Sequence, residues 1–383
     1  MTELERKALL PAGLRDVLPP DAAFEASVVE RLLAFFATRG FERVKPPLIE
    51  FEEGLLSGAG VALAPATFRL MDPVSQRMMG VRADITPQIA RIARTRLEAA
   101  PRPLRVSYGG EVLRVRGTQL RPERQLTQVG AELIGSAVPA ADAEIVAVAA
   151  AALESLGVAD LSVDLTVPRL VASVFDKFNL GGDSAAAIRA ALDHKDAAAV
   201  AARAGASASI LTALLAATGP VDTALGRLAA IDLPGSAAAE RDRLAEVAGL
   251  IRAAAPGLRL TLDPVEHRGF EYHTGIGFTI FAKSASGELG SGGRYRVRNG
   301  DADGERATGV TLYMETVLSV LRPPPPPRRV LVPVGADAGA VEALRADGWI
   351  TVSALEPVAD ATAEARRLGC THVLDGAGPR PAG

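Results

Sequence analysis

Alternation of polar and apolar residues over residues 111–135 predicts two strands joined by a polar turn. Because successive side chains of a strand point to opposite faces, Gln128, Gly130 and Glu132 should share one face of the second strand. If the two strands pair as a hairpin, Arg114 of the first strand joins this polar face. The face then offers a guanidinium, a carboxamide, a carboxylate and a space beside the glycine. Such a set suits a small zwitterion, although a solvent-exposed patch on an edge strand would look the same.

Hydrophobic periodicity predicts helices and strands on both sides of this hairpin. The strands mostly follow one another as hairpins with helices added, which favours an α+β fold with a mixed or antiparallel sheet. The predicted elements are a helix over 21–39 ended by Gly40, a hairpin over 68–84 turning at Asp72–Pro73, a helix over 86–100 with Thr86 as its N-cap, a helix over 141–156, a strand and helix over 161–178, strands over 258–282 that end in a turn at 291–296, and a strand and helix over 307–321.

Composition shifts along the chain predict a large domain, a linker and a small domain. The large domain covers residues 1–322 and contains an alanine-rich helical insert at about 183–254. Five consecutive prolines, 323–327, form a stiff linker. Residues 328–383 follow as a small βαβαβ domain of the α/β type.

The overall composition narrows the classes of function. Of 383 residues, 48% are hydrophobic and 23% charged, with a net charge of -3, which indicates a globular chain without a dedicated nucleic-acid surface. The single cysteine, Cys370, leaves no internal disulfide and no thiolate zinc site, and the four histidines lack metal-binding spacing. We therefore expect no metal, no cofactor and no membrane segment, and a cytoplasmic location.

Several motifs resemble those of the histidyl-tRNA synthetases, in the same order along the chain. Residues 113–135 resemble the second signature motif, and GLRDVLP at 13–19 with KPPLIE at 45–50 resembles the start and the first motif. HRGFEYHTG at 267–275 resembles the histidine-binding strand, and SGGRY at 291–295 the glycine strand beside it. The resemblance covers residues 7–321. It implies a class II aminoacyl-tRNA synthetase-like fold that dimerises through its first motif.

Departures from the synthetase motifs fall on the residues that serve ATP. Thr316 stands where the third motif has its catalytic arginine, and Arg116 and Pro122 replace a glutamate and an arginine of the second motif. Arg296 replaces the aspartate of the glycine strand. Without a phosphate clamp, adenylate formation loses its positioning and charge stabilisation. The small C-terminal domain is also short beside the anticodon-binding domain of the synthetases, so no tRNA is expected as a partner.

This combination resembles the regulatory subunits of ATP phosphoribosyltransferase, and the stretch VRADITPQIARIA at 81–93 supports that choice. The resemblance implies a non-catalytic subunit needed for the first step of histidine biosynthesis. It also implies a hetero-octamer with short-form catalytic subunits, and L-histidine as the effector of feedback inhibition. Two alternatives stay open: an active ligase that forms an aminoacyl-adenylate, and an amino-acid sensor with another partner.

The resemblance also implies a role for each residue of the polar face. Asp84 and Thr86 would contact the ammonium group of histidine, although both could simply cap the helix that follows them. Arg114 would bind the carboxylate, and Gln128 would orient the ligand. Glu132 would accept a hydrogen bond from the imidazole.

Further site residues come from the two later motifs. Arg268 would shape the pocket, Tyr272 would form a wall of it, and His273 stands where the synthetases have a second tyrosine. In the glycine strand, Gly292 and Gly293 allow close approach of the backbone. The arginines beside them, Arg294 and Arg296, are interpreted as solvated or interface residues.

Overall fold

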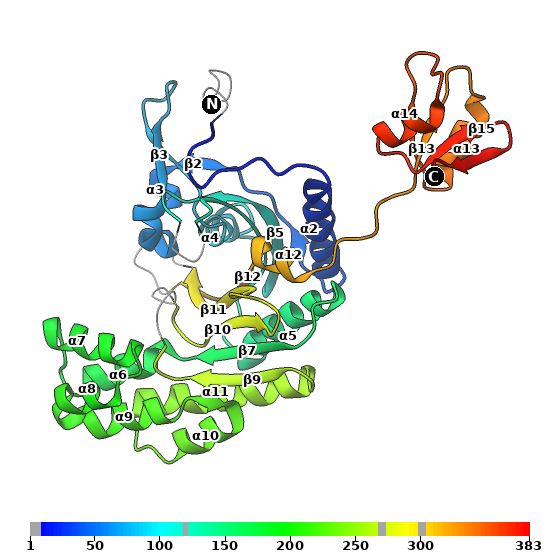
Figure 1. Ribbon diagram of the computed structural model, residues 1–383. Coiled ribbons are helices and arrows are strands. Elements are labelled where there is room, and N and C mark those ends of the chain that lie inside the picture. Colours follow the sequence, from blue (N-terminus) through cyan, green and yellow to red (C-terminus); the bar gives the residue numbers. More distant parts are fainter. Residues whose placement is uncertain (1–8, 118–121, 267–272, 298–303) are drawn as a thin grey trace. The chain divides into compact units, whose positions relative to one another are not determined.

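The computed structural model describes residues 9–117, 122–266, 273–297 and 304–383 (Figure 1). The chain forms two compact units, Met1–Arg322 and Pro323–Gly383. Residues 322–328, which include the proline run, have no regular secondary structure. No helix in the described part of the chain is long and apolar enough to cross a membrane.

A nine-stranded mixed sheet organises the large unit, in the order β1-β5-β6-β12-β11-β10-β7-β9-β8. The pairs β1–β5 and β7–β9 are parallel, and the other neighbours are antiparallel. The predicted α+β class with a mixed sheet is confirmed. The strands are β1 (Glu42–Arg43), β5 (Leu104–Leu113), β6 (Gln125–Ile134), β7 (Leu161–Thr166), β8 (Gly219–Pro220), β9 (Arg259–Asp263), β10 (Gly277–Ala282), β11 (Gly290–Val297) and β12 (Glu305–Tyr313).

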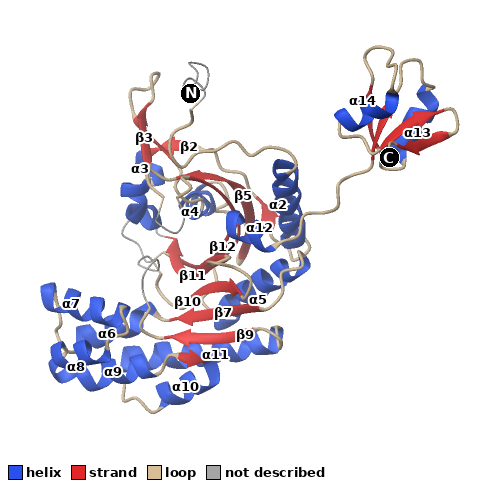
Figure 2. Ribbon diagram, viewed as in Figure 1, coloured by secondary structure: helices blue, strands red, loops and turns tan. Residues whose placement is uncertain are grey.

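Helices cover both faces of this sheet (Figure 2). On one face, Val129, Ala131 and Leu133 of β6 share a core with α2 (Asp21–Ala37) and α5 (Pro139–Ser155). On the other face, Tyr108 of β5 and Ile85 share a smaller core with α4 (Thr86–Thr95). The predicted alternation along β6 is therefore confirmed. Helix α12 (Met314–Val320) follows β12 and contacts β6 and α2.

A small antiparallel sheet, in the order β2-β4-β3, lies next to α4 in sequence. Its strands are β2 (Ile49–Phe51), β3 (Phe68–Met71) and β4 (Met78–Val81), and α3 (Glu52–Leu55) and the 3-10 helix η1 (Gly58–Ala66) connect β2 to β3. The predicted hairpin turn at Asp72 is confirmed, since its carboxylate accepts hydrogen bonds from the backbone N–H groups of Val74 and Ser75.

The alanine-rich insert is helical, and Figure 1 shows its helices packed together beyond β9. It follows β7 and α6 (Pro168–Lys177) and returns to the sheet through β9. Its helices are α7 (Gly182–Asp193), α8 (Ala197–Arg203), the 3-10 helix η2 (Gly205–Ser207), α9 (Ala208–Ala216), α10 (Val221–Ala229) and α11 (Gly235–Ala254).

The small unit contains a four-stranded sheet in the order β14-β13-β15-β16. The predicted βαβαβ part is present, with parallel pairing of β13 to β14 and β15. A final antiparallel strand, β16, was not predicted, because Gly378–Pro381 carries two prolines and little strand character. The elements are β13 (Arg329–Val332), α13 (Ala338–Ala346), β14 (Ile350–Ser353), α14 (Ala361–Arg367), β15 (His372–Asp375) and β16 (Gly378–Pro381).

Two predicted elements need correction. Residues 291–296 are not a turn but the middle of β11, where Gly292 and Gly293 pair with Val310 and Gly309. The helix predicted over 86–100 ends at Thr95. Glycines suggest turns in a sequence, but here the close approach of neighbouring backbones requires them: a Cβ on Gly292 would lie 2.1 Å from the Gly309 carbonyl oxygen. The predicted close backbone approach at this glycine pair is confirmed.

Candidate functional site

Four of the predicted site residues meet between β6 and the start of α4. Gln128 accepts a hydrogen bond from the Ile85 N–H at 3.1 Å and donates one to the Asp84 carboxylate at 3.0 Å. Glu132 lies four residues after Gln128, on the same face of β6. Its carboxyl group accepts a hydrogen bond from the Thr86 hydroxyl at 3.3 Å. A carboxamide, a hydroxyl and two carboxyl groups are thus linked by direct contacts.

The local geometry separates the roles of Asp84 and Thr86. The Asp84 carboxylate accepts the N–H of Thr86 at 2.8 Å, so it satisfies one of the free N–H groups at the start of the helix. Thr86 is the first residue of α4 and Ile85 is the N-cap, so the prediction that Thr86 caps the helix is wrong. The Thr86 hydroxyl is turned instead toward Glu132 and Tyr108.

Glu132 is the most unusual ionisable group of this region. It is 1% exposed and forms no ion pair with the described residues. Its carboxyl group accepts a hydrogen bond from the Tyr295 hydroxyl at 3.0 Å. Burial raises the pKa of Glu132 to about 8, against the hydrogen bonds from Tyr295 and Thr86. Near neutral pH this group is therefore mostly a neutral acid, and a cation beside it would favour its ionised form.

Glycine makes room for this carboxyl group, but not at the predicted position. A Cβ on Gly309 of the neighbouring strand would lie 1.7 Å from the Glu132 Oε2 atom. Gly130, in contrast, leaves no space for a ligand, because the ring and hydroxyl of Tyr108 fill it: a Cβ there would lie 2.3 Å from both. The glycine was predicted to leave room for a ligand or for another backbone. Room for a ligand is wrong, because the tyrosine lies directly across the hairpin, but the close backbone approach is present, since the same Cβ would lie 2.6 Å from the Val310 carbonyl oxygen.

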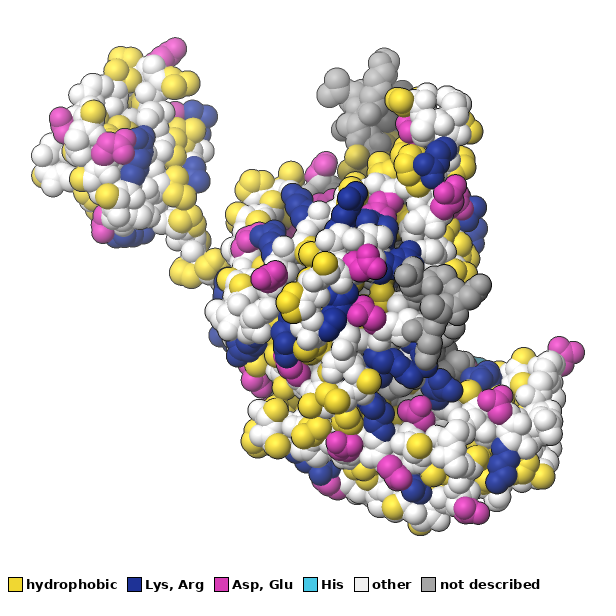
Figure 3. Space-filling view, turned by 180° about the vertical axis from the view of Figure 1, so that it is seen from behind, with side chains coloured by type: hydrophobic (Ala, Val, Ile, Leu, Met, Phe, Trp, Pro, Cys, Tyr) yellow, Lys and Arg dark blue, Asp and Glu magenta, His cyan; other side chains and the backbone are white. Residues whose placement is uncertain are grey.

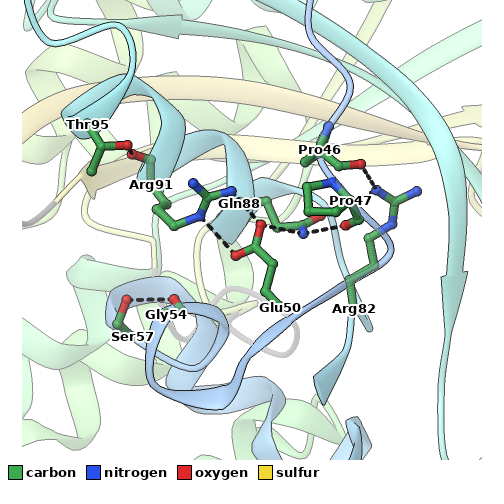
Figure 4. A network of polar contacts seen from close by, with 9 residues as sticks. All are labelled: Pro46, Pro47, Glu50, Gly54, Ser57, Arg82, Gln88, Arg91 and Thr95. Atoms are coloured by element: carbon green, nitrogen blue, oxygen red, sulfur yellow. Dashed lines mark hydrogen bonds and ion pairs between the residues drawn. The ribbon is translucent and has the colours of Figure 1, made fainter. Parts of the chain in front are cut away.

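A buried polar network holds the segment that carries Asp84 (Figure 4). The guanidinium group of Arg82 donates to the carbonyl oxygens of Glu111 at 2.6 Å and of Pro46 at 3.1 Å. Gln88 of α4 donates to the Pro47 carbonyl oxygen and to the Glu50 carboxylate, both at 2.8 Å.

The same network includes an ion pair between helix and sheet. Arg91 of α4 pairs with the Glu50 carboxylate through two of its nitrogens. Pro47 therefore accepts a hydrogen bond from the start of α4, and Pro46 accepts one from Arg82, which precedes that helix. Two residues of α4, Gln88 and Arg91, fix Glu50. This arrangement sets the position of Asp84 and Thr86 against β6.

Arg114 lies at the edge of this group, just beyond the end of β5. It is half-buried and forms an isolated bridge with Thr67, and its Nε is 3.5 Å from the Ala83 carbonyl oxygen. Burial raises the pKa of Tyr313 to about 12, and the negative charge of Glu288 adds to this effect. The charge of Asp84 raises this pKa as well, and that of Arg114 lowers it. Arg114 and Asp84 thus lie near the same tyrosine.

Of the three site residues predicted from the later motifs, only His273 lies within the described residues; Arg268 and Tyr272 lie outside them. His273 is 8% exposed, and its ring packs against Gly293, where a Cβ would lie 2.6 Å from the ring. The histidine lines a cavity together with Thr86, Glu132 and Tyr295. The cavity has a volume of about 10 Å³, enough for one water. We call this space the acid cavity.

Three residues of the site were missed: Tyr108, Tyr295 and Thr311. The Tyr108 hydroxyl lies 2.8 Å from the Thr311 hydroxyl and 3.3 Å from that of Thr86. Period-two alternation from Arg114 back along β5 places Tyr108 on the polar face, so this signal was present in the sequence. Tyr295 lies in the SGGRY motif at 291–295, which by itself gives the tyrosine no role.

Thr316, which stands where the third synthetase motif has its arginine, lies in α12, and its side chain is half-buried. The neighbouring Glu315 accepts a hydrogen bond from the Thr127 N–H at 2.8 Å. Within the described ranges, no group of three or more histidine, cysteine, aspartate or glutamate side chains could hold a metal ion.

Comparison with known proteins identifies the fold and the family of this chain. The family model described as histidyl-tRNA synthetase matches residues 13–317. Among solved structures, the ATP phosphoribosyltransferase regulatory subunit/histidyl-tRNA synthetase from Bacillus halodurans is 21% identical with a TM-score of 0.79, covering 94% of this chain and 96% of that one. The histidyl-tRNA synthetase from Nostoc sp. PCC 7120 is 18% identical with a TM-score of 0.79, covering 96% and 91%. These two likenesses establish the fold.

Relatives of higher identity carry one name. The ATP phosphoribosyltransferase regulatory subunit of Paramagnetospirillum magneticum is 58% identical over 98% of both chains. The protein of the same name from Rhodospirillum centenum is 58% identical over 96% of this chain and 95% of its own, and that from Gluconobacter oxydans is 44% identical over 99% of both. The chain therefore belongs to the family of ATP phosphoribosyltransferase regulatory subunits, on a class II histidyl-tRNA synthetase-like fold.

Proposed function

We propose that this chain is a non-catalytic subunit that binds free L-histidine and regulates a catalytic ATP phosphoribosyltransferase subunit in the first step of histidine biosynthesis. One observation carries the histidine site: a buried carboxyl group, Glu132, lies without an ion-pair partner among the described residues, next to Asp84, Thr86 and Gln128. A buried acid of raised pKa gives up its proton more readily when a cation lies beside it, so a cationic group of a ligand would complete this site.

In the proposed complex, the ammonium group of histidine contacts Asp84 and Thr86, and its carboxylate pairs with Arg114. The imidazole hydrogen-bonds with Glu132, and Gln128 holds Asp84 in place through its amide. The acid cavity alone is smaller than an amino acid, so the ligand must extend beyond it or widen it. His273, Arg268 and Tyr272 complete the proposed imidazole pocket.

The proposal excludes adenylate formation, because Thr316 has no charge to offer a triphosphate. The relatives' names support a catalytic partner, and for this chain we propose a short-form catalytic subunit in a hetero-octamer built on a dimer of this chain, in the cytoplasm and without tRNA. Residues 1–322 form the histidine-binding domain in this scheme. Feedback inhibition then requires that histidine bind one state of the complex better than another, while substrates prefer the opposite state.

A paired assay separates this function from the ligase alternative. The purified chain should give no histidine-dependent exchange between ATP and pyrophosphate. Added to a short-form catalytic subunit, it should raise phosphoribosyl transfer to ATP, and histidine should then lower that rate. Exchange activity would identify a ligase, and a catalytic subunit indifferent to this chain would point to another partner.

A further inference from the structure

A second cavity adjoins the segment that follows His273. Its volume is about 230 Å³. We call it the arginine cavity because its walls include Arg243, Arg294 and Arg306. Arg294 belongs to β11 and Arg306 to β12, whereas Arg243 belongs to α11 of the helical insert. Figure 3, which views the molecule from behind, shows Lys and Arg side chains gathered where the main body meets the insert.

Arg294 is a fixed charge at this site. It is 2% exposed, and its Nε donates to both oxygens of the Asp142 carboxylate at 2.9 and 3.0 Å. Its other nitrogens donate to the carbonyl oxygens of Ser136 and Val138 at 2.8 and 3.1 Å. The interpretation of Arg294 as a solvated residue is therefore wrong: every arm of this guanidinium has a protein partner.

The other donors of the cavity are only partly used. Arg243 donates to Asp142 at 3.0 Å and to the Ala137 carbonyl oxygen at 2.8 Å through one nitrogen, Nη2. Among the residues that the structure describes, its buried Nε and the buried hydroxyl of Thr274 have no hydrogen-bond partner. Within the same part of the chain, the Arg306 side chain forms no hydrogen bond or ion pair.

Among the residues that the structure describes, charge in and around the cavity is not balanced. Two carboxylates, Asp142 and Glu240, lie among four arginines, Arg169, Arg243, Arg294 and Arg306, and Glu240 lies 3.9 Å from Arg169. These four positive groups less the two negative groups leave an excess of two positive charges. Burial lowers the pKa of Arg294, and the like charges of Arg243 and Arg306 lower it further. An anion in the cavity would relieve this repulsion.

We propose that the arginine cavity binds a phosphate dianion, either free or as the end of a small phosphate ester, through Arg243, Arg306 and the Thr274 hydroxyl. A phosphate group carries about −1.5 to −2 charges near pH 7, which matches the excess, and it offers three or more acceptor oxygens. Guanidinium groups bind such oxygens in bidentate, charge-assisted pairs. Arg294 supplies the fixed charge behind them.

The cavity is tied to the neighbouring acid cavity through the backbone. The Thr274 N–H donates to the Arg294 carbonyl oxygen at 2.7 Å, and the Arg294 N–H donates to the Ile276 carbonyl oxygen at 2.9 Å. A ligand held by Thr274 would therefore restrain the segment that carries His273.

The test is calorimetric titration of the full chain with inorganic phosphate, pyrophosphate and ribose 5-phosphate, at an ionic strength held constant with sodium chloride. We expect saturable binding of at least one of them at one site per chain. Arg306→Gln should weaken it by about 10–100-fold, as for one lost charge-assisted hydrogen bond. Arg203→Gln, which removes an exposed arginine of α8, is the matched control and should change nothing.

Two further variants give effects of opposite sign. Thr274→Val keeps the side-chain shape and should weaken phosphate binding, while Glu240→Gln removes a negative charge from the wall and should tighten it. The proposal is overturned if none of the three anions binds saturably, or if Arg306→Gln and Arg203→Gln bind them equally. None of these measurements uses histidine, so their failure leaves the proposed histidine site untouched.

Discussion

The acid cavity and the arginine cavity are both lined by residues of β11, yet they treat buried charge in opposite ways. Glu132 is buried among hydroxyl groups and has no cation beside it in the described part of the chain, and burial raises its pKa to about 8. In the arginine cavity, Asp142 pairs with both Arg294 and Arg243. A buried pair is costly to break because one charge then stays uncompensated. A buried acid without a cation beside it, or a surplus of arginines, instead indicates a ligand of opposite charge. The first cavity is thus suited to a cationic group and the second to an anion.

Removing the compensating carboxylate should have the largest effect on stability. Asp142→Asn leaves Arg294 buried without its counter-charge and should lower the free energy of unfolding by about 3–5 kcal/mol. Urea unfolding of the full chain measures it. Glu30→Gln breaks the exposed pair with Arg43 and should change this free energy by less than about 1 kcal/mol. Equal losses in the two variants would show that the buried Arg294 does not depend on Asp142 as its counter-charge.

Glu132→Gln should change how stability depends on pH. The folded-state pKa of Glu132, about 8, lies above its ordinary value of 4.5, so the folded state holds this proton more tightly than the unfolded state. The resulting stability is fully present below pH 4.5 and is lost as the pH rises through 8. Relative to the glutamine variant, the wild type should lose on the order of 4 kcal/mol over this window.

Urea unfolding at a series of pH values between 5 and 9 measures this loss. Glu98→Gln, at an exposed position, should keep the wild-type profile. A constant difference between wild type and Glu132→Gln across the series would show that Glu132 titrates as an ordinary exposed glutamate.

Gly130→Ala tests whether tyrosine packing, rather than open space, lines the polar face. The added methyl group would meet the Tyr108 hydroxyl at 2.3 Å and the Val310 carbonyl oxygen at 2.6 Å, so we expect a loss of about 1–3 kcal/mol. Gly249→Ala in α11 meets no atom within 4 Å and should raise helix stability by about 1 kcal/mol. If Gly130→Ala were neutral, the space beside Gly130 would be open after all.

Much of the fold could be predicted because its signals are local. Period-two alternation along β6 separated Gln128 and Glu132 from the apolar face, and proline and glycine marked most element ends. The glycines of β11 suggested a turn, but they are needed because the backbone of β12 approaches them closely once the two strands pair. The same limit hid the arginine cavity, whose arginines come from three separate elements.

For the site, the motifs identified residues but not their partners. Asp84, Thr86, Gln128 and Glu132 do meet. Period-two alternation places Tyr108 on their face, but its position opposite Gly130 depends on the register of the hairpin. Register is set by the hydrophobic pattern and the turn geometry together. The burial of Glu132 follows from the Gly309 contact across the sheet, and no local pattern reveals it.

The most direct test of the central claim is calorimetric titration of the full chain with L-histidine, for the wild type and for Glu132→Ala, with ATP and magnesium titrated separately. We expect the wild type to bind histidine but not ATP, and Glu132→Ala to lose about 1.5–3 kcal/mol of histidine binding free energy, as for a lost charge-assisted hydrogen bond. Equal histidine affinity in the two chains, or no binding to the wild type, would contradict the assignment of this polar face as a histidine site.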